Sequence, residues 1–124
     1  MSSALLDSNV LIYAANEVSE SLWDLVCTSG NAVASITAIE VYGFAGLEVN
    51  EKGALDTLFA FLDVLPLDER VISESIRLRQ SRRMGLADAV IAATALVHSM
   101  PLVTRNVEDF KGIAGLEVIN PFAD

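Results

Sequence analysis

Four acidic residues stand where a buried strand ends or a helix begins. Asp7 follows a short apolar run, Glu40 and Asp109 each follow an expected strand closely, and Asp88 lies in the first turn of an apolar helical stretch. Carboxylates held at close range repel one another and raise their own pKa values, and a divalent cation offsets that repulsion. Oxygen ligands without His or Cys suit Mg²⁺ or Mn²⁺. These residues therefore indicate metal-assisted hydrolysis of a phosphodiester.

Each of these acids also has an alternative interpretation as a helix cap. Asp7 precedes an expected helix, and aspartate is among the preferred N-cap residues, so for Asp7 alone the two interpretations are balanced. Thr37 and Glu40 have the spacing of a capping box, and for Glu40 alone the cap is favoured. Asp109 has the same spacing after an asparagine. Asp88 complements the dipole of its helix, but its apolar neighbours leave a carboxylate poorly hydrated unless it lines a cleft.

Short apolar runs alternate with helical patterns along the chain. Expected strands cover residues 4–6, 32–34, 64–67, 101–104 and 116–119, and expected helices cover 9–15, 20–29, 37–48, 54–62, 68–84 and 86–99. Strands that are apolar without alternation are typical of a parallel sheet covered on both faces. The sequence thus predicts a single α/β domain over residues 1–124, a doubly wound parallel sheet with helices on both faces. Ligands bind beyond the carboxyl ends of strands in such sheets, where the acids fall.

Composition excludes several classes of function. The chain has 124 residues, of which 52% are hydrophobic, enough for one domain with its own core. Its one cysteine, Cys27, cannot form an intrachain disulfide, which favours the reducing cytoplasm. Cys27 and the one histidine, His98, form no base-activated nucleophile that we can identify, and we interpret Cys27 as a core residue. No apolar run is long enough to cross a membrane, and no secretory signal is present.

Five ordered segments of the sequence carry a family resemblance. They are residues 5–14 (LLDSNVLIYA), 37–42 (TAIEVY), 85–95 (GLADAVIAATA), 102–110 (LVTRNVEDF) and 115–122 (GLEVINPF). Together they resemble the PIN domains, especially the VapC-type toxins of toxin–antitoxin pairs. The resemblance implies an endoribonuclease that uses Mg²⁺ or Mn²⁺, with Asp7, Glu40 and Asp88 as catalytic residues. It implies Asp7 and Asp88 as metal ligands, with Glu40 either ligating the metal or orienting water.

One position in the fourth segment departs from the pattern. Many relatives carry an acid directly after the Thr104–Arg105 pair, whereas this chain has Asn106. Asp109 then replaces that acid, or Asn106 acts through a water molecule, and a second metal is in question. The alternative to an enzyme is an inactive PIN-like module that binds RNA or protein. Family resemblance further implies a homodimer and a VapB-type antitoxin partner. The small residues of segment 42–47 would permit close approach of two helices, or packing of that helix on its own sheet.

The net charge of −9 is unusual for a protein that binds RNA. Basic residues are concentrated late in the chain, and Arg79, Arg82 and Arg83 end the expected helix 68–84. On a wheel of about 100° per residue, these arginines share an arc with Val71, Ile72, Ile76 and Leu78. They either neutralise the helix C-terminus and extend to water, or, with Arg105, bind RNA phosphates or an acidic antitoxin tail.

Overall fold

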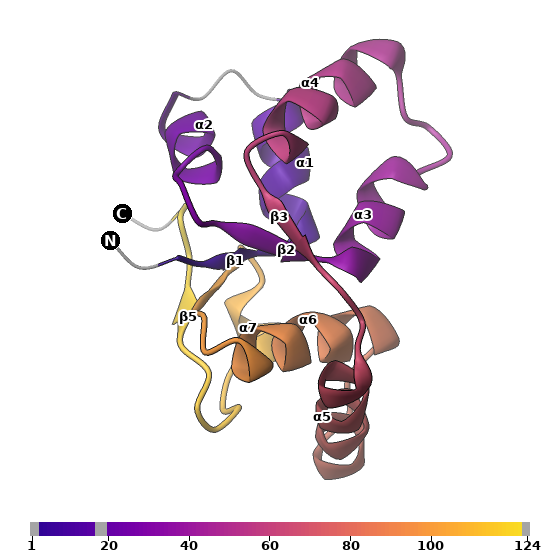
Figure 1. The fold of residues 1–124 in the computed structure, drawn as a ribbon, viewed down its shortest axis with the longest axis vertical. Coiled ribbons are helices and arrows are strands. Elements are labelled where there is room, and N and C mark those ends of the chain that lie inside the picture. Colours follow the sequence, from indigo (N-terminus) through magenta and orange to yellow (C-terminus); the bar gives the residue numbers. More distant parts are fainter. Residues whose placement is uncertain (1–2, 17–19, 123–124) are drawn as a thin grey trace.

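A computed structural model describes residues 3–16 and 20–122 (Figure 1). The strands are β1 (Leu5–Leu6), β2 (Ala32–Ala34), β3 (Asp63–Leu65), β4 (Leu102–Val103) and β5 (Val118–Ile119). The helices are α1 (Ser8–Asn16), α2 (Glu20–Val26), α3 (Ser35–Tyr42), α4 (Val49–Phe59), α5 (Glu69–Ser81), α6 (Leu86–Val97) and α7 (Val107–Phe110).

The five strands form one parallel sheet in the order β3-β2-β1-β4-β5. From β1 the chain proceeds outward through β2 to β3, and then returns to the other side of β1 to form β4 and β5. The direction of winding therefore reverses between β1 and β4, the position at which open α/β sheets place their ligands. The expected doubly wound parallel sheet is confirmed.

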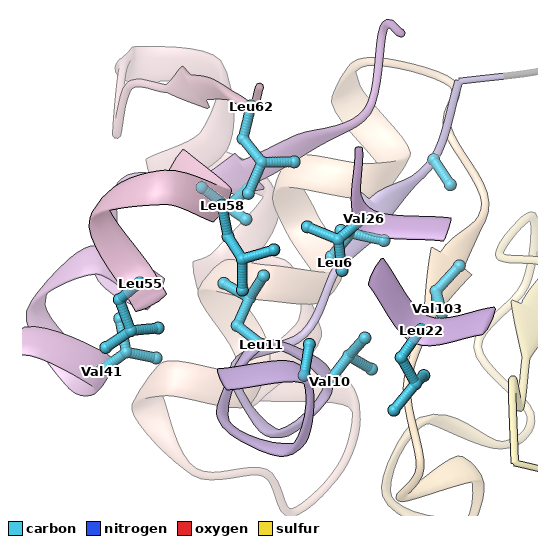
Figure 2. Packing of buried hydrophobic residues seen from close by; sticks show 13 residues of the cluster. Leu6, Val10, Leu11, Leu22, Val26, Val41, Leu55, Leu58, Leu62 and Val103 are labelled. Carbon is cyan, nitrogen blue, oxygen red and sulfur yellow. The ribbon is translucent and has the colours of Figure 1, made fainter. Parts of the chain in front are cut away.

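Helices cover both faces of the sheet, with α1, α2 and α4 on one side and α5, α6 and α7 on the other (Figure 1). Successive residues of a strand point to opposite faces, so Leu6 packs under α1 and α4 while Leu5 packs against α6. In Figure 2 the side chains of Leu11 and Leu58 lie against each other beside Leu6. Packing in these two apolar layers holds the sheet in place, and with it the carboxyl ends of the strands.

Helix α6 is almost wholly enclosed. Residues 89–95 are all buried, and four of the seven are alanines. Small side chains allow α6 to approach both the sheet and α5, its neighbour (Figure 1). Because residues 89–95 are buried, packing sets the position of the helix, and Asp88 in its first turn is carried to the edge of the sheet.

The sequence pattern predicts a helix over 37–48 followed by a turn at 49–53, and both predictions are wrong in their bounds. Helix α3 begins earlier, at Ser35, and ends at Tyr42 with Gly43 as its C-cap. Glycine is a poor helix former, and Gly43 and Gly46 stop the helix that the apolar pattern alone would continue. Helix α4 then begins at Val49, inside the expected turn, with a capping box made by Glu48 and Glu51.

The expected apolar arc of the helix over 68–84 is partly wrong. Helix α5 begins after Asp68, whose carboxylate accepts a hydrogen bond from the amide of Val71 at 3.0 Å, and ends at Ser81. Its buried side chains are Val71, Ser75 and Leu78, whereas Ile72 and Ile76 are exposed. Helix α5 therefore buries a different set of side chains from the apolar arc that the sequence predicts.

Three further differences concern the bounds of α2 and β3 and one additional helix. Helix α2 ends at Val26, before the predicted Ser29, and strand β3 covers Asp63–Leu65, so Pro66 follows the strand. The short helix α7, Val107–Phe110, had no counterpart in the sequence prediction. Helix α7 is important for the site because it carries Asp109.

Candidate metal centre

The four predicted acids come from four separate helical starts or turns around the carboxyl edge of the sheet. Asp7 lies between β1 and α1, Glu40 lies in α3, Asp88 lies in the first turn of α6, and Asp109 lies in α7. The structure brings them into electrostatic contact, because the charges of Glu40 and Asp109 raise the pKa of both Asp7 and Asp88. Residues separated by up to about a hundred positions thus share one acidic region.

Asp7 is the centre of a hydrogen-bond network at the switch point of the sheet. Its side chain is only 5% exposed. Oδ2 accepts hydrogen bonds from the Thr104 hydroxyl at 2.7 Å and from the Asn9 amide at 3.2 Å, and Oδ1 accepts one from the Ser8 backbone amide at 2.8 Å. Thr104 follows β4, so its bond to Asp7 connects the two strands between which the winding reverses. The carboxylate is therefore held in a fixed orientation.

The capping-box interpretation of Glu40 is wrong. Helix α3 begins at Ser35, two residues before Thr37, and its N-cap, Ala34, has no side-chain cap hydrogen bond. Thr37 is fully buried in the helix. The carboxylate of Glu40 instead accepts a hydrogen bond at Oε1 from the hydroxyl of Ser8. Glu40 therefore faces the acidic region, next to Asp7, and does not stabilise the start of its own helix.

The position of Asp7 is that of an N-cap, but its carboxylate accepts from the Ser8 amide and not from the second or third backbone amide of α1. Asp7 directly precedes α1, and its backbone carbonyl accepts from the Val10 amide at 3.1 Å, as expected at a helix start. At the same time the buried carboxylate faces Thr104 from the neighbouring strand. An ordinary surface cap would not need a hydroxyl donor from a residue that is itself completely buried.

Burial and repulsion both disfavour ionised carboxylates in this region. Desolvation raises the pKa of Asp7, partly offset by its hydrogen bonds, and Glu40 and Asp109 raise it further. The pKa of Asp88 is raised from 3.8 to about 6, first by desolvation and then by the charges of Asp7, Asp109 and Glu40. Perturbation by burial together with specific like charges is typical of functional sites. These carboxylates therefore destabilise the folded protein unless a cation binds beside them.

No basic side chain among the described residues supplies that cation. The ion pairs of residues 3–16 and 20–122 join Lys52 to Asp56, Arg70 to Asp68, Arg77 to Glu74 and Lys111 to Glu108. None involves the four acids of the centre. A divalent cation would offset their repulsion, and a set of carboxylate oxygens matches the ligands that hard cations take. The donor chemistry therefore fits a metal ion.

The four acids are not gathered into a ready metal-binding group. Within residues 3–16 and 20–122, no three His, Cys, Asp or Glu side chains are close enough to one another to make a ready metal-binding group. Mutual repulsion is a sufficient reason for carboxylates to stay apart without a cation between them.

The polar residues of segment 102–110 differ in burial and in hydrogen bonding. Thr104 is fully buried, and its hydroxyl accepts from the backbone amide of Asn106 at 3.0 Å while donating to Asp7. Asn106 is exposed and is the N-cap of α7, but it makes no side-chain cap hydrogen bond. Asn106 therefore lacks the side-chain hydrogen bond that the capping interpretation of Asp109 requires. The charge of Asp109, one turn further on, acts on both Asp7 and Asp88.

The four arginines that were candidates for RNA binding have different surroundings. Arg82, the C-cap of α5, donates to the carbonyl of Lys111 at 2.6 Å and more weakly to that of Asp109 at 3.4 Å. Arg79 donates to a backbone carbonyl of the loop after α5. Arg83 has no hydrogen bond or ion pair among the described residues, and Arg105 is stacked on aromatic rings. Arg82 therefore anchors the segment that carries Asp109.

Sequence reasoning missed the side chains that orient the acids. Ser8 and Asn9, directly after Asp7, each donate a hydrogen bond to a carboxylate of the centre. Tyr13 and Phe122 were also missed, although both belong to segments that carry the family resemblance. The signal was the occurrence of two small polar residues immediately after a buried strand, a place where side chains turn toward the edge of the sheet.

Cys27 and His98 lie away from the acidic edge. Cys27 follows α2 and packs against the core of one face, and burial is the main cause of its raised pKa. His98 is the C-cap of α6, ahead of the amino end of β4, whereas the acids surround the carboxyl ends of the strands. Across residues 3–16 and 20–122, no helix is both long and apolar enough to cross a membrane.

Known proteins are similar to most of this chain. A family described as "PIN domain" matches residues 4–116. The chain is similar to Ribonuclease VapC1 of Methanocaldococcus jannaschii, with 30% identity over 89% of this chain and 80% of that protein. It is 51% identical to Ribonuclease VapC1 of Rickettsia felis over 41 residues, 33% of this chain and 31% of that protein. A solved toxin–antitoxin complex from Klebsiella pneumoniae contains a chain with a TM-score of 0.81 and 31% identity, covering 98% of this chain and 100% of that one.

Proposed function

Because this chain belongs to the PIN-domain family, we propose that it is a metal-dependent endoribonuclease and the toxin of a toxin–antitoxin pair. The relatives named above are ribonucleases by name, and the similar solved chain belongs to a toxin–antitoxin complex. The observation that carries the proposal is the group of four mutually repelling acids, without a basic partner among the described residues, at the switch point of the sheet.

Asp7 and Asp88 would hold the metal ion. Asp7 is fixed by three hydrogen bonds, and the pKa of Asp88 responds to every other acid of the centre. A bound cation would polarise a phosphoryl oxygen and lower the pKa of a coordinated water. The oxygen-only donor set favours Mg²⁺ or Mn²⁺ over zinc.

Glu40 and Asp109 would complete the chemistry from the two sides of Asp7. The Ser8 hydroxyl leaves one carboxylate oxygen of Glu40 without a protein donor, and that oxygen is available to ligate the metal or to orient and deprotonate water. Asp109 replaces the missing acid at Asn106, because its charge reaches both Asp7 and Asp88. Thr104 and Ser8 position these carboxylates.

The substrate strand would be bound by Arg79, Arg82, Arg83 and Arg105. Arg83 and Arg105 have no acceptor of their own among the described residues, and Arg79 and Arg82 donate to backbone carbonyls only, so no acidic side chain neutralises their charges. An antitoxin would neutralise the enzyme in its resting state, and we further propose a homodimer. The single unpaired cysteine suits the reducing cytoplasm.

The second candidate is an inactive PIN-like binding module, and the uncharged Asn106 is the observation in its favour. Incubation of the purified chain with a pool of labelled RNA separates the two. We expect cleavage in Mg²⁺ or Mn²⁺, none in EDTA, and none of a DNA pool of the same sequences. Binding of RNA without cleavage in either metal would establish the module instead, and absence of both would reject an RNA function.

A further inference from the structure

Arg105 is held by two aromatic side chains from distant parts of the chain. Its guanidinium carbon lies 4.5 Å from the ring centroid of Tyr13 in α1 and 5.4 Å from that of Phe122, which follows β5. The two rings contact each other edge to face, with centroids 5.2 Å apart. A guanidinium stacked on rings has fewer rotamers to lose when it binds a ligand. The cation is therefore preorganised.

The N–H donors of the Arg105 guanidinium remain available beside the two rings. The five N–H groups of arginine lie in the plane of the group, and those of Arg105 have no acceptor among the described residues. The other basic residues of those ranges, except Arg83, have a carboxylate or carbonyl partner. In a chain of net charge −9, Arg105 thus carries a charge that no acidic side chain among the described residues neutralises.

The backbone of Arg105 is connected to the acidic centre through Asn9. Asn9 connects the two, because its side chain donates to Asp7 and accepts from the backbone amide of Arg105 at 3.4 Å. Tyr13, which supports the guanidinium, lies one helical turn beyond Asn9, about 5.4 Å along the helix axis. Arg105 is therefore attached through its backbone to the network that holds Asp7, so a strand bound at Asp7 would pass beside the residue that carries this cation.

We propose that Arg105, supported by Tyr13 and Phe122, forms a subsite for the RNA phosphate next to the one that is cleaved. This inference rests on the proposed ribonuclease function. An RNA phosphodiester is the ligand favoured, because the substrate strand must cross the metal centre beside this cation. The flat in-plane donors of arginine match the two free oxygens of a phosphodiester. Tyr13 and Phe122 are positioning residues for the cation.

The test is steady-state cleavage of a labelled single-stranded RNA in Mg²⁺ at several NaCl concentrations. For Arg105→Ala we expect KM to rise roughly tenfold, as for loss of a charged hydrogen bond, with a smaller change in kcat. The slope of log(1/KM) against log salt should decrease by about 0.7, the value for one contact to a single strand. Tyr13→Leu keeps the charge, so it should raise KM with the slope preserved.

Arg77→Ala is the matched control, because Arg77 pairs with Glu74 on the exposed surface of α5. It removes the same charge and should leave KM and the slope unchanged. If Arg105→Ala fails to fold, Arg105→Gln retains part of the side-chain stem and gives the same slope test.

Three outcomes would overturn the subsite. An unchanged KM and slope in Arg105→Ala, with a lower melting temperature, would show that the contacts of Arg105 with Tyr13 and Phe122 only stabilise the fold. Loss of affinity for a polyglutamate peptide with unchanged RNA kinetics would assign Arg105 to an acidic protein partner. If the wild-type chain does not cleave RNA at all, the proposed function and the subsite fail together, whereas the first two outcomes leave the function intact.

Discussion

Replacing Asp88 by asparagine should stabilise the metal-free protein while removing a ligand of the proposed metal centre. Asp88 has a pKa raised from 3.8 to about 6. Each pKa unit corresponds to about 1.4 kcal/mol, so the ionised side chain would cost about 3 kcal/mol if nothing screened it. Because Asp88 is only half-buried, solvent screens part of this cost. We expect Asp88→Asn to gain about 1 to 2 kcal/mol at pH 7, or roughly 4 to 8 °C in melting temperature.

The sign of the pH dependence follows from the same pKa. Below about pH 4 Asp88 is protonated in both the folded and the unfolded state, and the penalty is absent. Between pH 4 and about 6 the folded protein retains a proton that the unfolded chain releases, so stability falls as pH rises. Above pH 6 the full penalty applies. The metal-free wild type should therefore lose stability between pH 4 and 7, and Asp88→Asn should lose less, with Asp7 accounting for a remaining part.

Thermal unfolding in EDTA, followed by circular dichroism from pH 4 to 7, measures this directly. Asp63→Asn is the control, because Asp63 is an exposed acid on the edge strand and its replacement changes the net charge equally. Addition of Mn²⁺ at pH 7 should raise the melting temperature of the wild type and of Asp63→Asn, but not of Asp88→Asn. A metal-free Asp88→Asn protein that is no more stable than wild type at pH 7 would refute the repulsion argument.

Three further predictions concern single side chains. Thr104→Val removes the hydroxyl that donates to Asp7 and should lower the cleavage rate about 10-fold or more, whereas Thr104→Ser should stay near wild type; equal rates in the two variants would contradict the orienting role. Arg82→Ala removes the bonds to the carbonyls of Lys111 and Asp109 and should cost about 1 kcal/mol, with faster amide hydrogen exchange around residues 109–111; unaltered exchange there would show that the segment is held by other contacts. Cys27→Ala and His98→Gln should keep cleavage within about twofold of wild type, because neither residue is near the acids; loss of turnover in a folded, metal-bound His98→Gln protein would indicate acid–base work by histidine.

The sequence was sufficient to predict the sheet and its acidic edge. Short apolar strands separated by helices can be covered on both faces in few ways, and the acids after β1 and at the start of α6 have fixed places in that arrangement. The order of the strands was not predictable, because residues 5–6 and 102–103 pair through contacts that no local pattern encodes.

The errors came from local patterns that tertiary contacts overrode. The spacing of Thr37 and Glu40 satisfied a capping box, yet α3 begins at Ser35, directly after β2, and the Glu40 carboxylate bonds to Ser8 from another helix. Ile72 and Ile76 were placed in the core because they are apolar, although the buried face of α5 contains Ser75. Ser75 is accommodated there because its hydroxyl donates to the carbonyl of Val71 at 2.7 Å.

The central claim is that the acids around Asp7 form the catalytic metal centre, and the cleavage rate of Asp7→Asn tests it most directly. The rate is measured on a labelled RNA at saturating Mn²⁺ and compared with wild type and with Asp63→Asn, after circular dichroism has shown that all three are folded. Asparagine keeps the shape of the side chain that Thr104 and Ser8 contact, but removes the charge that a cation requires. We predict that Asp7→Asn abolishes cleavage while Asp63→Asn cleaves like wild type. Cleavage by Asp7→Asn within a few-fold of the wild-type rate would contradict the account.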